Sequence, residues 1–524
     1  MIHIFFDAGT GFRYLHEVRE PIARSRRRSW PAVAALVLSL VPLSNINASG
    51  DAGLTVVGMD VRVELRPEQG LMTETARITL EGSSGPVVRF RLNQALLVER
   101  SRAGEGVAGH SQTGDELTVT MTPPMENERR TLTLVMTGRP RYLGADRITE
   151  NGAVLGGADH WIPTLPLTAA MVNLEVVAPP GWAVLGSGEP AAGRTGDVHR
   201  FQTMRPVRSV GLAAGPGLRT TVATLARTPL RVIGDQSRDA SGLASIFADP
   251  MTWLSGTVAP YPFESLNLAF VPGIRRPAYA GGFIAIPADQ ATTTLADGAD
   301  LIASLWFGQH LAGDGPWMES LAAWQAMAYA RDRGQGVPSR LAAQRDRYLS
   351  MSGNRDVAIS RADGDTTGAV IRGKGSSAWD MIRMTCGNRH FQARMAAMTA
   401  EPFGPPLELA AVRARFAAGT TEPVEMVFID WFDRIGLPRF TTALKTLPTS
   451  RDEWRADLSI KQLGRAYTLS LDVVFHGAGQ ERRETIRIDQ HTTQLLFVLP
   501  FQALRVELDP LGRIFKQPTF TRKQ

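Results

Sequence analysis

Apolar and polar residues alternate along the part of the chain that follows residue 50. The alternation is clear at residues 61–65, 117–121 and 132–134, and a cluster of turn-forming residues such as 81–85 separates the runs. A period of two puts alternate side chains on one face of a strand, so that one face packs and the other meets water. Residues 51–225 therefore predict an antiparallel β domain.

The middle of the chain changes to the period of an α-helix. Leu301 and Leu305 recur at helical spacing within residues 297–309, and a second apolar stripe follows within residues 317–333 after a loop rich in Gly and Pro. Apolar residues three and four apart lie on one face of a helix, which packs against a core. We therefore expect a mainly helical domain over residues 226–448.

Alternation returns near the C-terminus. It runs through residues 469–473, 486–488, 496–498 and 506–508. Short alternating strands with turns between them are typical of a small sandwich. Residues 449–524 thus predict a C-terminal β-sandwich, and the whole chain predicts a multidomain α+β protein.

The first 50 residues have the order of charge and hydropathy that targeting segments share. A basic run at residues 24–28 precedes an apolar run at residues 30–43, and small residues follow at 48–50. The apolar run is short for a membrane span. We expect residues 1–50 to be a signal segment and the protein to be exported to the periplasm or cell envelope. Membrane association through an uncleaved segment is the alternative.

Charge and cysteine content narrow the class of function. The 524 residues carry a net charge of +6, about half of it in residues 1–50, and no basic stripe with interleaved aromatics occurs. We therefore expect no nucleic-acid partner. Cys386 is the only cysteine, which excludes an internal disulfide, and its apolar surroundings predict an unreactive core thiol.

In the helical region, residues 305–308 read LWFG and residues 317–324 read WMESLAAW. These two runs resemble motifs of the membrane alanyl aminopeptidase family, the aminopeptidase N-like zinc metallopeptidases of the thermolysin-like (gluzincin) group. In that family, H-E-x-x-H is followed by a Q-W-F-G or Q-W-W-G run, and a second helix begins W-L-x-E-G-L-A. The resemblance implies a thermolysin-like, mainly helical peptidase domain between the two β regions.

The same register shows what stands at the family's chemical positions. Asp300 and Ser304 take the places of the two histidines, Leu301 takes that of the glutamate base, and Glu319 is the only retained ligand candidate. Two histidines at i and i+4 share a helix face and hold zinc, and a catalytic zinc needs about three protein ligands. We therefore expect no cofactor, with Asp300 and Ser304 ordinary polar residues on a scaffold helix. Zinc is expected only if this interpretation of the site is wrong.

Two further family positions are also altered. The G-x-M-E-N motif falls on residues 278–283, where Ala280, Gly281 and Gly282 are substrate-binding candidates that offer backbone but no carboxylate. The tyrosine of the family's Y-x-K-G run is replaced by Arg372. We expect Arg372 to be a solvated surface residue, and a residual anion site for substrate is the alternative.

These vacancies favour a peptide- or protein-binding pseudopeptidase that has lost its zinc and its activity. One alternative is an active metallopeptidase whose unorthodox metal site combines Asp300, His310 and Glu319. The other is a scaffold subunit of an envelope complex.

Overall fold

The computed structural model describes residues 53–517 except for short gaps at 104–106, 143, 167, 193–195, 291, 293, 314, 352–355, 363–367, 401–405 and 450–452. The predicted signal segment, residues 1–50, lies outside the described residues. Within the described part of the chain, no helix combines the length and the apolar character needed to cross a membrane.

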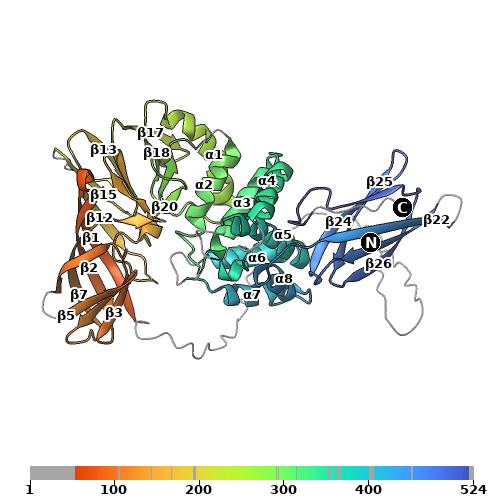
Figure 1. Cartoon of the computed structure of the whole chain (residues 1–524), viewed down its shortest axis with the longest axis horizontal. Helices are drawn as coiled ribbons and strands as arrows, with labels where there is room; N and C mark the ends of the chain where they lie inside the picture. The colour runs from red at the N-terminus through yellow and green to blue at the C-terminus, as the bar shows by residue number, and fades with distance from the viewer. Residues whose placement is uncertain are drawn as a thin grey trace, which may run out of the picture. The chain divides into compact units, whose positions relative to one another are not determined.

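A seven-stranded sheet forms the main layer of the N-terminal region, drawn in red to yellow in Figure 1. Its order is β14–β15–β12–β1–β2–β7–β4, and β2 (Leu71–Gly82) pairs antiparallel with β1 (Leu54–Arg66) and β7 (Glu128–Gly138). By contrast, β1 runs parallel to β12 (Met171–Val177). Alternate residues of β2 are buried. The predicted β region and its half-buried strands are therefore confirmed, with one parallel pairing that the alternation did not reveal.

Smaller sheets complete this region. They have the orders β3–β6–β5, β10–β11–β16–β13 and β8–β9. Their strands, and the others of the large sheet, are β3 (Val87–Arg91), β4 (Leu96–Ala103), β5 (Val107–Thr113), β6 (Glu116–Met121), β8 (Arg141–Tyr142), β9 (Ala145–Asp146), β10 (Ile148–Thr149), β11 (Gly152–Leu155), β13 (Trp182–Gly186), β14 (Glu189–Pro190), β15 (Val198–Gln202) and β16 (Leu212–Pro216).

A five-stranded sheet follows, with the order β17–β18–β19–β21–β20. Strands β18 (Thr228–Gly234), β19 (Leu266–Val271) and β21 (Phe283–Pro287) run parallel, and β20 (Ala278–Ala280) closes the edge antiparallel to β21. Every residue of β19 and β21 is buried, as in a sheet covered on both faces. Because β17 (Arg219–Leu225) pairs with β18, this sheet begins at Arg219.

The helices follow the predicted pattern closely. Helix α2 (Leu295–Trp306) begins at a capping box in which Thr294 accepts from the Asp297 amide and the Asp297 side chain accepts from the Thr294 amide. Helix α3 (Trp317–Asp332) packs against α2, and it is buried on nearly every side. The remaining helices are α1 (Ala240–Thr257), α4 (Val337–Met351), the π-helical turn η4 (Val370–Lys374), α5 (Gly375–Cys386), α6 (Asn388–Thr399), α7 (Leu409–Ala417), α8 (Val424–Phe432) and the short 3-10 turns η1 (Pro67–Gln69), η2 (Gly157–Asp159) and η3 (Ile359–Arg361).

Two three-stranded sheets make up the C-terminal region, drawn in blue in Figure 1. Their orders are β22–β23–β26 and β25–β24–β27, and the rings of Phe475 and Phe497 meet between them with centroids 4.8 Å apart. The multidomain α+β class with terminal β regions and a helical centre is confirmed. The strands are β22 (Phe440–Pro448), β23 (Trp454–Gln462), β24 (Leu469–His476), β25 (Glu481–Ile488), β26 (Thr492–Leu499) and β27 (Arg505–Leu508).

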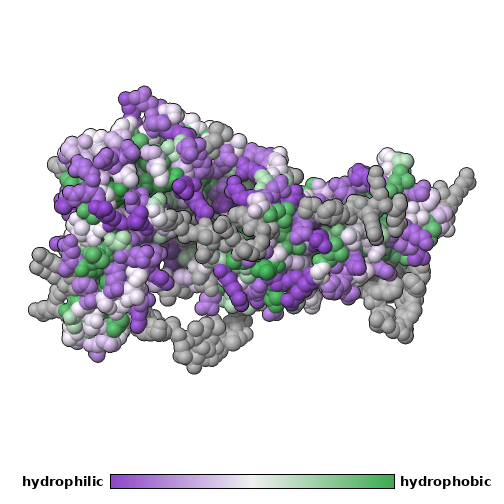
Figure 2. Space-filling view, in the orientation of Figure 1, coloured by the Kyte–Doolittle hydropathy of each residue, from purple (hydrophilic) through white to green (hydrophobic). Residues whose placement is uncertain are grey.

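Large apolar side chains at the surface come from separate elements. Leu97, Val222, Met426 and Val498 are examples, each on a different strand or helix. On the face drawn in Figure 2, green residues form small groups among purple ones. Such scattered exposure is ordinary for a protein surface.

The single cysteine is half-buried at the end of α5. Burial raises the pKa of the Cys386 thiol to about 11. The thiol is therefore protonated at neutral pH and a poor nucleophile.

Candidate functional site

Five polar side chains from four elements meet beside helix α2, and we call them the Arg372 cluster. Helix α2 contributes Asp300 and Ser304, α3 contributes Glu319, η4 contributes Arg372, and β20 contributes Tyr279. The Arg372 guanidinium forms an ion pair with the Asp300 carboxylate. The Tyr279 hydroxyl hydrogen-bonds with Ser304, and Glu319 acts electrostatically on both Tyr279 and Arg372. The structure thus brings together Asp300, Ser304, Glu319 and Arg372, all of which the sequence singled out.

Helical geometry explains why Asp300 and Ser304 belong to one site. They are four residues apart and so lie on the same face of α2. The opposite side of the helix carries the apolar stripe, and the Leu301 side chain is buried in it. The position at which the resemblance implies a general base therefore holds an alkyl group that faces the core.

Arg372 reaches the cluster because the chain makes a π-helical turn at η4. Such turns widen a helix locally and often occur at functional sites. Within this turn, Arg372 bonds with Asp300, whereas Lys374 is fully buried and its Nζ donates to the carbonyl oxygen of Arg434. The turn thereby directs two basic side chains to different partners.

Two glycines allow neighbouring elements to approach this turn closely. A Cβ on Gly373 would lie 2.8 Å from Cζ of Phe515, and a Cβ on Gly375 would lie 2.4 Å from Cβ of Ser320. Real Cβ atoms do not come so close to another carbon. The turn is therefore held between α3 on one side and the C-terminal segment on the other.

The expectation that Arg372 is a solvated surface residue is wrong. Only 27% of its side chain is exposed, and it is paired with Asp300, whose side chain is 41% exposed. The Asp300 carboxylate raises the pKa of Arg372 despite the opposing effect of burial, and Tyr279 and Glu319 act in the same direction as Asp300. Asp300, expected to be an ordinary polar residue of a scaffold helix, forms the ion pair of the cluster.

Tyr279 is the member of the cluster that sequence reasoning missed. Burial raises its pKa to about 12, although Arg372 opposes the shift, so the phenol is protonated and can donate a hydrogen bond. The signal was available, because Tyr279 is the only polar side chain in residues 278–283. What the sequence did not show is that β20 lies against α2.

The three substrate-binding candidates beside Tyr279 form a tight, buried turn between β20 and β21. The Gly281 amide donates to the Ser209 carbonyl at 3.1 Å, and Gly282 adopts a left-handed φ of +64°. Ala280 is fully buried. The turn therefore leaves Tyr279 as the residue of this hairpin whose side chain joins the cluster.

His310, the imidazole of the alternative metal site, lies in a different electrostatic setting. Burial and the nearby Arg208 lower its pKa to about 4, so the ring is neutral at pH 7. Among the described residues, no three His, Cys, Asp or Glu side chains are arranged to hold a metal ion. The combination of Asp300, His310 and Glu319 is therefore not assembled as a ligand set.

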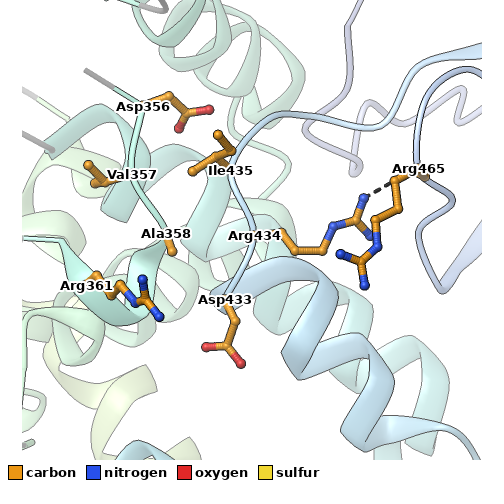
Figure 3. Close-up of a pocket in the computed structure, with 8 residues that line it drawn as sticks. All are labelled: Asp356, Val357, Ala358, Arg361, Asp433, Arg434, Ile435 and Arg465. Atoms are coloured by element: carbon orange, nitrogen blue, oxygen red, sulfur yellow. Dashed lines mark hydrogen bonds between the residues drawn. The ribbon is translucent and has the colours of Figure 1, made fainter. Parts of the chain in front are cut away.

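A separate cavity of about 580 Å³ lies where the chain passes from α8 towards the C-terminal sheets (Figure 3). Arg434 is fixed there by Asp430 at 2.6 Å and by the Arg465 carbonyl at 3.1 Å. The Asp433 carboxylate is paired with Arg413 at 2.6 Å. The lining residues are Asp356, Val357, Ala358, Arg361, Asp433, Arg434, Ile435 and Arg465, so the cavity contains no member of the Arg372 cluster.

No protein-family model and no curated protein sequence matches this chain. Solved structures do match. A glutamate-to-alanine mutant of an M1 zinc metallopeptidase from Deinococcus radiodurans aligns with a TM-score of 0.63 at 20% identity, over 74% of this chain and 96% of its own. The chain has the M1 metallopeptidase fold.

Two further M1 structures align with the same extent of coverage, 74% of this chain and 96% of their own. One is the Deinococcus radiodurans mutant bound to a Tyr-Ser-Ala substrate, with a TM-score of 0.61 and 19% identity. The other is a two-domain M1 zinc metallopeptidase mutant bound to L-tryptophan, with a TM-score of 0.61 and 20% identity. At this level of identity the likeness concerns the fold.

The M1 fold implies zinc, and the side chains of the cluster can be tested against that ion. Zinc prefers imidazole, thiolate and carboxylate donors, usually three from the protein at a catalytic centre. Here Ser304 offers only a neutral hydroxyl, which hydrogen-bonds with Tyr279. The Asp300 carboxylate already forms an ion pair with the guanidinium of Arg372. A permanent positive charge beside the remaining carboxylate, Glu319, opposes a second cation. These residues do not fit a catalytic zinc ion.

Proposed function

We propose that this chain is an exported, peptide-binding protein of the M1 fold that does not hydrolyse its ligand. The observation that carries the proposal is the Asp300–Arg372 ion pair with the buried Leu301 beside it. Activation of water at a metal needs an open cation site and a base that accepts a proton. In the cluster, the cation is the side chain of Arg372, which is covalently part of the protein. The position of the base is taken by the alkyl side chain of Leu301.

Peptide binding is supported by two separate observations. Structures of the same fold hold a Tyr-Ser-Ala substrate and L-tryptophan. In this chain, β20 is the edge strand of the five-stranded sheet and carries Tyr279 into the cluster. An extended peptide can add to an edge strand through backbone hydrogen bonds, and a cluster of donors and acceptors then orients one end.

Calorimetric titration of the purified mature protein with short peptides, Tyr-Ser-Ala among them, tests the proposal. We expect saturable binding that is insensitive to EDTA, and intact peptide by mass spectrometry after prolonged incubation. Tyr279→Ala is expected to weaken binding at least about tenfold. Tyr142→Ala, on β8 of the N-terminal region, is the matched control and is expected to bind as the wild type does.

Two results would contradict the proposal. Turnover of peptides that stops on addition of EDTA would show an active metallopeptidase. If no peptide in a diverse library binds, peptides are not the ligands of this protein.

Export is a separate part of the proposal and rests on the charge and hydropathy order of residues 1–50. A fusion of residues 1–50 to a reporter that is active only outside the cytoplasm is expected to be active. A fusion with the basic run at residues 24–28 changed to acidic residues is expected to be inactive.

A further inference from the structure

We propose that Arg372 is the resident cation of the Arg372 cluster, a guanidinium that occupies the place a divalent metal has in zinc peptidases of the same fold. In this view the side chain keeps the architecture of the site together and excludes a metal ion. The inference shares with the proposed function only the lack of zinc, and it does not depend on peptide binding.

The position of Arg372 is the first support. Its guanidinium is bonded to Asp300, on the α2 face that also carries Ser304. Helix α3, which carries Glu319, packs against both α2 and the η4 turn. Arg372 is thus paired at one of the three positions at which the resemblance implies metal ligands and interacts electrostatically with another, Glu319.

Charge balance is the second support. Asp300 and Glu319 place two carboxylates around one half-buried site, and like charges at close range destabilise each other unless a cation lies between them. Arg372 supplies that cation within the chain. A guanidinium presents a fixed fork of donors to carboxylates and keeps its proton at all physiological pH values. It therefore replaces the structural effect of a metal but cannot generate a metal-bound hydroxide.

The backbone that carries Arg372 is the third support, because it holds the side chain in a defined place. Gly373 and Gly375 let Phe515 and Ser320 approach the turn from either side. The Ser377 hydroxyl, two residues further on, donates to the Arg513 carbonyl at 2.8 Å and accepts from the Phe515 amide at 2.9 Å. The turn that presents the guanidinium is therefore fixed by α3 and by the C-terminal segment.

A double-mutant cycle on the full mature chain tests the electrostatic part. Arg372→Met and Asp300→Asn are each expected to lower Tm by about 3 °C or more, because each leaves its partner unpaired in a half-buried site. The double variant is expected to melt no lower than the worse single variant. Arg487→Met is the control, since Arg487 pairs with Glu422 at 2.8 Å with the two side chains 43% and 44% exposed, and it is expected to change Tm by less than about 1 °C.

A metal titration tests the replacement itself. Zinc chloride is expected to leave the Tm of the wild type and of Arg372→Lys unchanged, because both keep a positive charge at the site. Arg372→Ala exposes Asp300 and Glu319 without a counter-charge, so zinc is expected to raise its Tm by several degrees. Glu319→Gln in the same background is expected to abolish that rise.

Reconstruction of the family donors gives a second route, which does not depend on the stability of Arg372→Ala. The triple variant Asp300→His, Leu301→Glu, Ser304→His is expected to bind zinc stoichiometrically only when Arg372 is also replaced by Tyr. Zinc bound by the triple variant with Arg372 present, or one zinc bound by the wild type, would overturn the inference. Equal responses of wild type and Arg372→Ala to zinc together with additive effects in the cycle would overturn it as well.

The two proposals fail separately. If the wild type binds no peptide, the proposed function is contradicted, but the inference that Arg372 is the resident cation is unaffected. A wild type that binds peptide and also carries one zinc contradicts the resident cation alone.

Discussion

Gly375 and Ser320 lie so close together that a methyl group on Gly375 would overlap the Ser320 side chain. The ideal Cβ of Gly375 falls 2.4 Å from Cβ of Ser320, an atom that cannot swing away because it is attached to the α3 backbone. The contact sets the spacing between α3 and the start of α5. Glu319 directly precedes Ser320, and Arg372 lies three residues before Gly375. The same spacing therefore also sets the distance between Glu319 and Arg372.

Gly375→Ala is therefore expected to destabilise the protein by roughly 2–3 kcal/mol through overpacking. Chemical denaturation of the wild type and the variant measures the difference. Ser320→Gly introduced into the Gly375→Ala background moves the Cβ from one helix to the other, and it is expected to recover at least about half of the loss.

Gly242→Ala is the matched control for this substitution. Gly242 lies in helix α1 and nothing approaches its ideal Cβ within 4 Å. Alanine there is expected to be neutral or to stabilise by about 0.5–1 kcal/mol, because it reduces the entropy lost on helix formation. Equal losses at Gly242 and Gly375 would show that overlap with Ser320 is not the cause.

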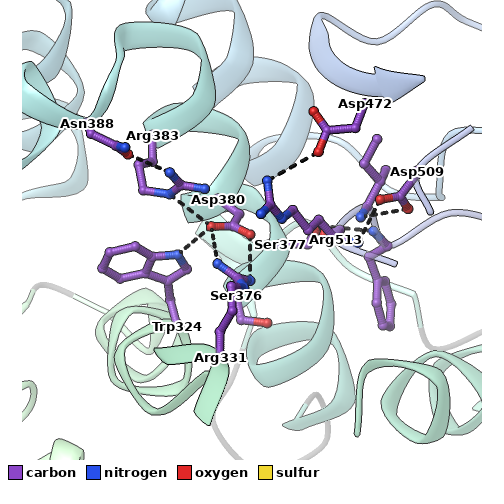
Figure 4. Close-up of polar contacts among 12 residues, drawn as sticks. Trp324, Arg331, Ser376, Ser377, Asp380, Arg383, Asn388, Asp472, Asp509 and Arg513 are labelled. Carbon is purple, nitrogen blue, oxygen red and sulfur yellow. Dashed lines mark hydrogen bonds and ion pairs between the residues drawn. The ribbon is translucent and has the colours of Figure 1, made fainter. Parts of the chain in front are cut away.

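The Asp380 carboxylate on α5 joins two helices, because its partners lie on α3 and on α5 itself, as Figure 4 shows. It is buried and accepts from Trp324 Nε1 at 3.1 Å, from both terminal nitrogens of Arg331 at 2.8 and 3.2 Å, and from Arg383 Nε at 3.1 Å. Burial works against ionisation, but Arg331 and Arg383 hold the pKa of Asp380 below its usual range.

Asp380→Asn is expected to lower the free energy of unfolding by roughly 3 kcal/mol, because it leaves two guanidiniums beside a neutral amide. Thermal or denaturant unfolding at pH 7 measures the loss. Asp457→Asn breaks an exposed pair with Arg455 at 2.7 Å and is expected to cost less than about 1 kcal/mol. Equal losses in the free energy of unfolding for the two variants would show that the buried network of Asp380 does not stabilise the protein more than an exposed ion pair does.

Glu74 is a fully buried carboxylate in the N-terminal sheet, and neither of its oxygens has a hydrogen-bond partner among the described residues. Burial raises its pKa well above the usual range. The folded state then holds a proton that the unfolded state has already released, so stability is lost as pH rises above the unfolded pKa of about 4.5.

Glu74→Met is expected to raise the free energy of unfolding at pH 7 by roughly 2 kcal/mol. The gain is expected to shrink as pH falls towards about 4.5, because the wild-type carboxyl is then increasingly protonated in both states. Unfolding curves at pH 4 and pH 7 test both statements. Glu68→Met, at an exposed position in the neighbouring turn, is expected to change stability little at either pH.

Lys374 gives a pH dependence in the alkaline range. Burial lowers its pKa from 10.5 to about 8, with Asp356 opposing the shift and Arg434 adding to it. Between pH 8 and 10.5 the unfolded state therefore binds more protons than the folded state, and stability rises with pH.

Lys374→Met removes this titration. The free energy of unfolding of the wild type is expected to rise relative to that of the variant by roughly 2–3 kcal/mol from pH 8 to pH 10.5. If plots of the free energy of unfolding against pH run parallel for the two proteins across that range, the buried ammonium of Lys374 does not titrate there. Lys445→Met, on the half-exposed strand β22, supplies the comparison for a lysine at the surface.

Much of the fold was predictable because it depends on local periodicity. Alternation at residues 61–65 anticipated β1, and the helical stripes placed α2 and α3 to within a few residues. Strand partners were not predictable in the same way. The parallel pairing of β1 with β12 joins segments more than a hundred residues apart, and alternation gives a strand its faces but not its neighbours.

The sequence by itself determined which residues stand at the chemical positions of the fold. Helix geometry puts Asp300 and Ser304 on one face whatever surrounds them, and the resemblance implies that they stand where that family has its two histidines. Only the tertiary structure decided what Asp300, Tyr279 and Arg372 do there. Asp300 and Arg372 are 72 residues apart, and a π-helical turn rather than an α-helix aims the guanidinium at α2. Side-chain partners across such separations follow from the packing of whole elements, and no periodicity within either segment encodes them.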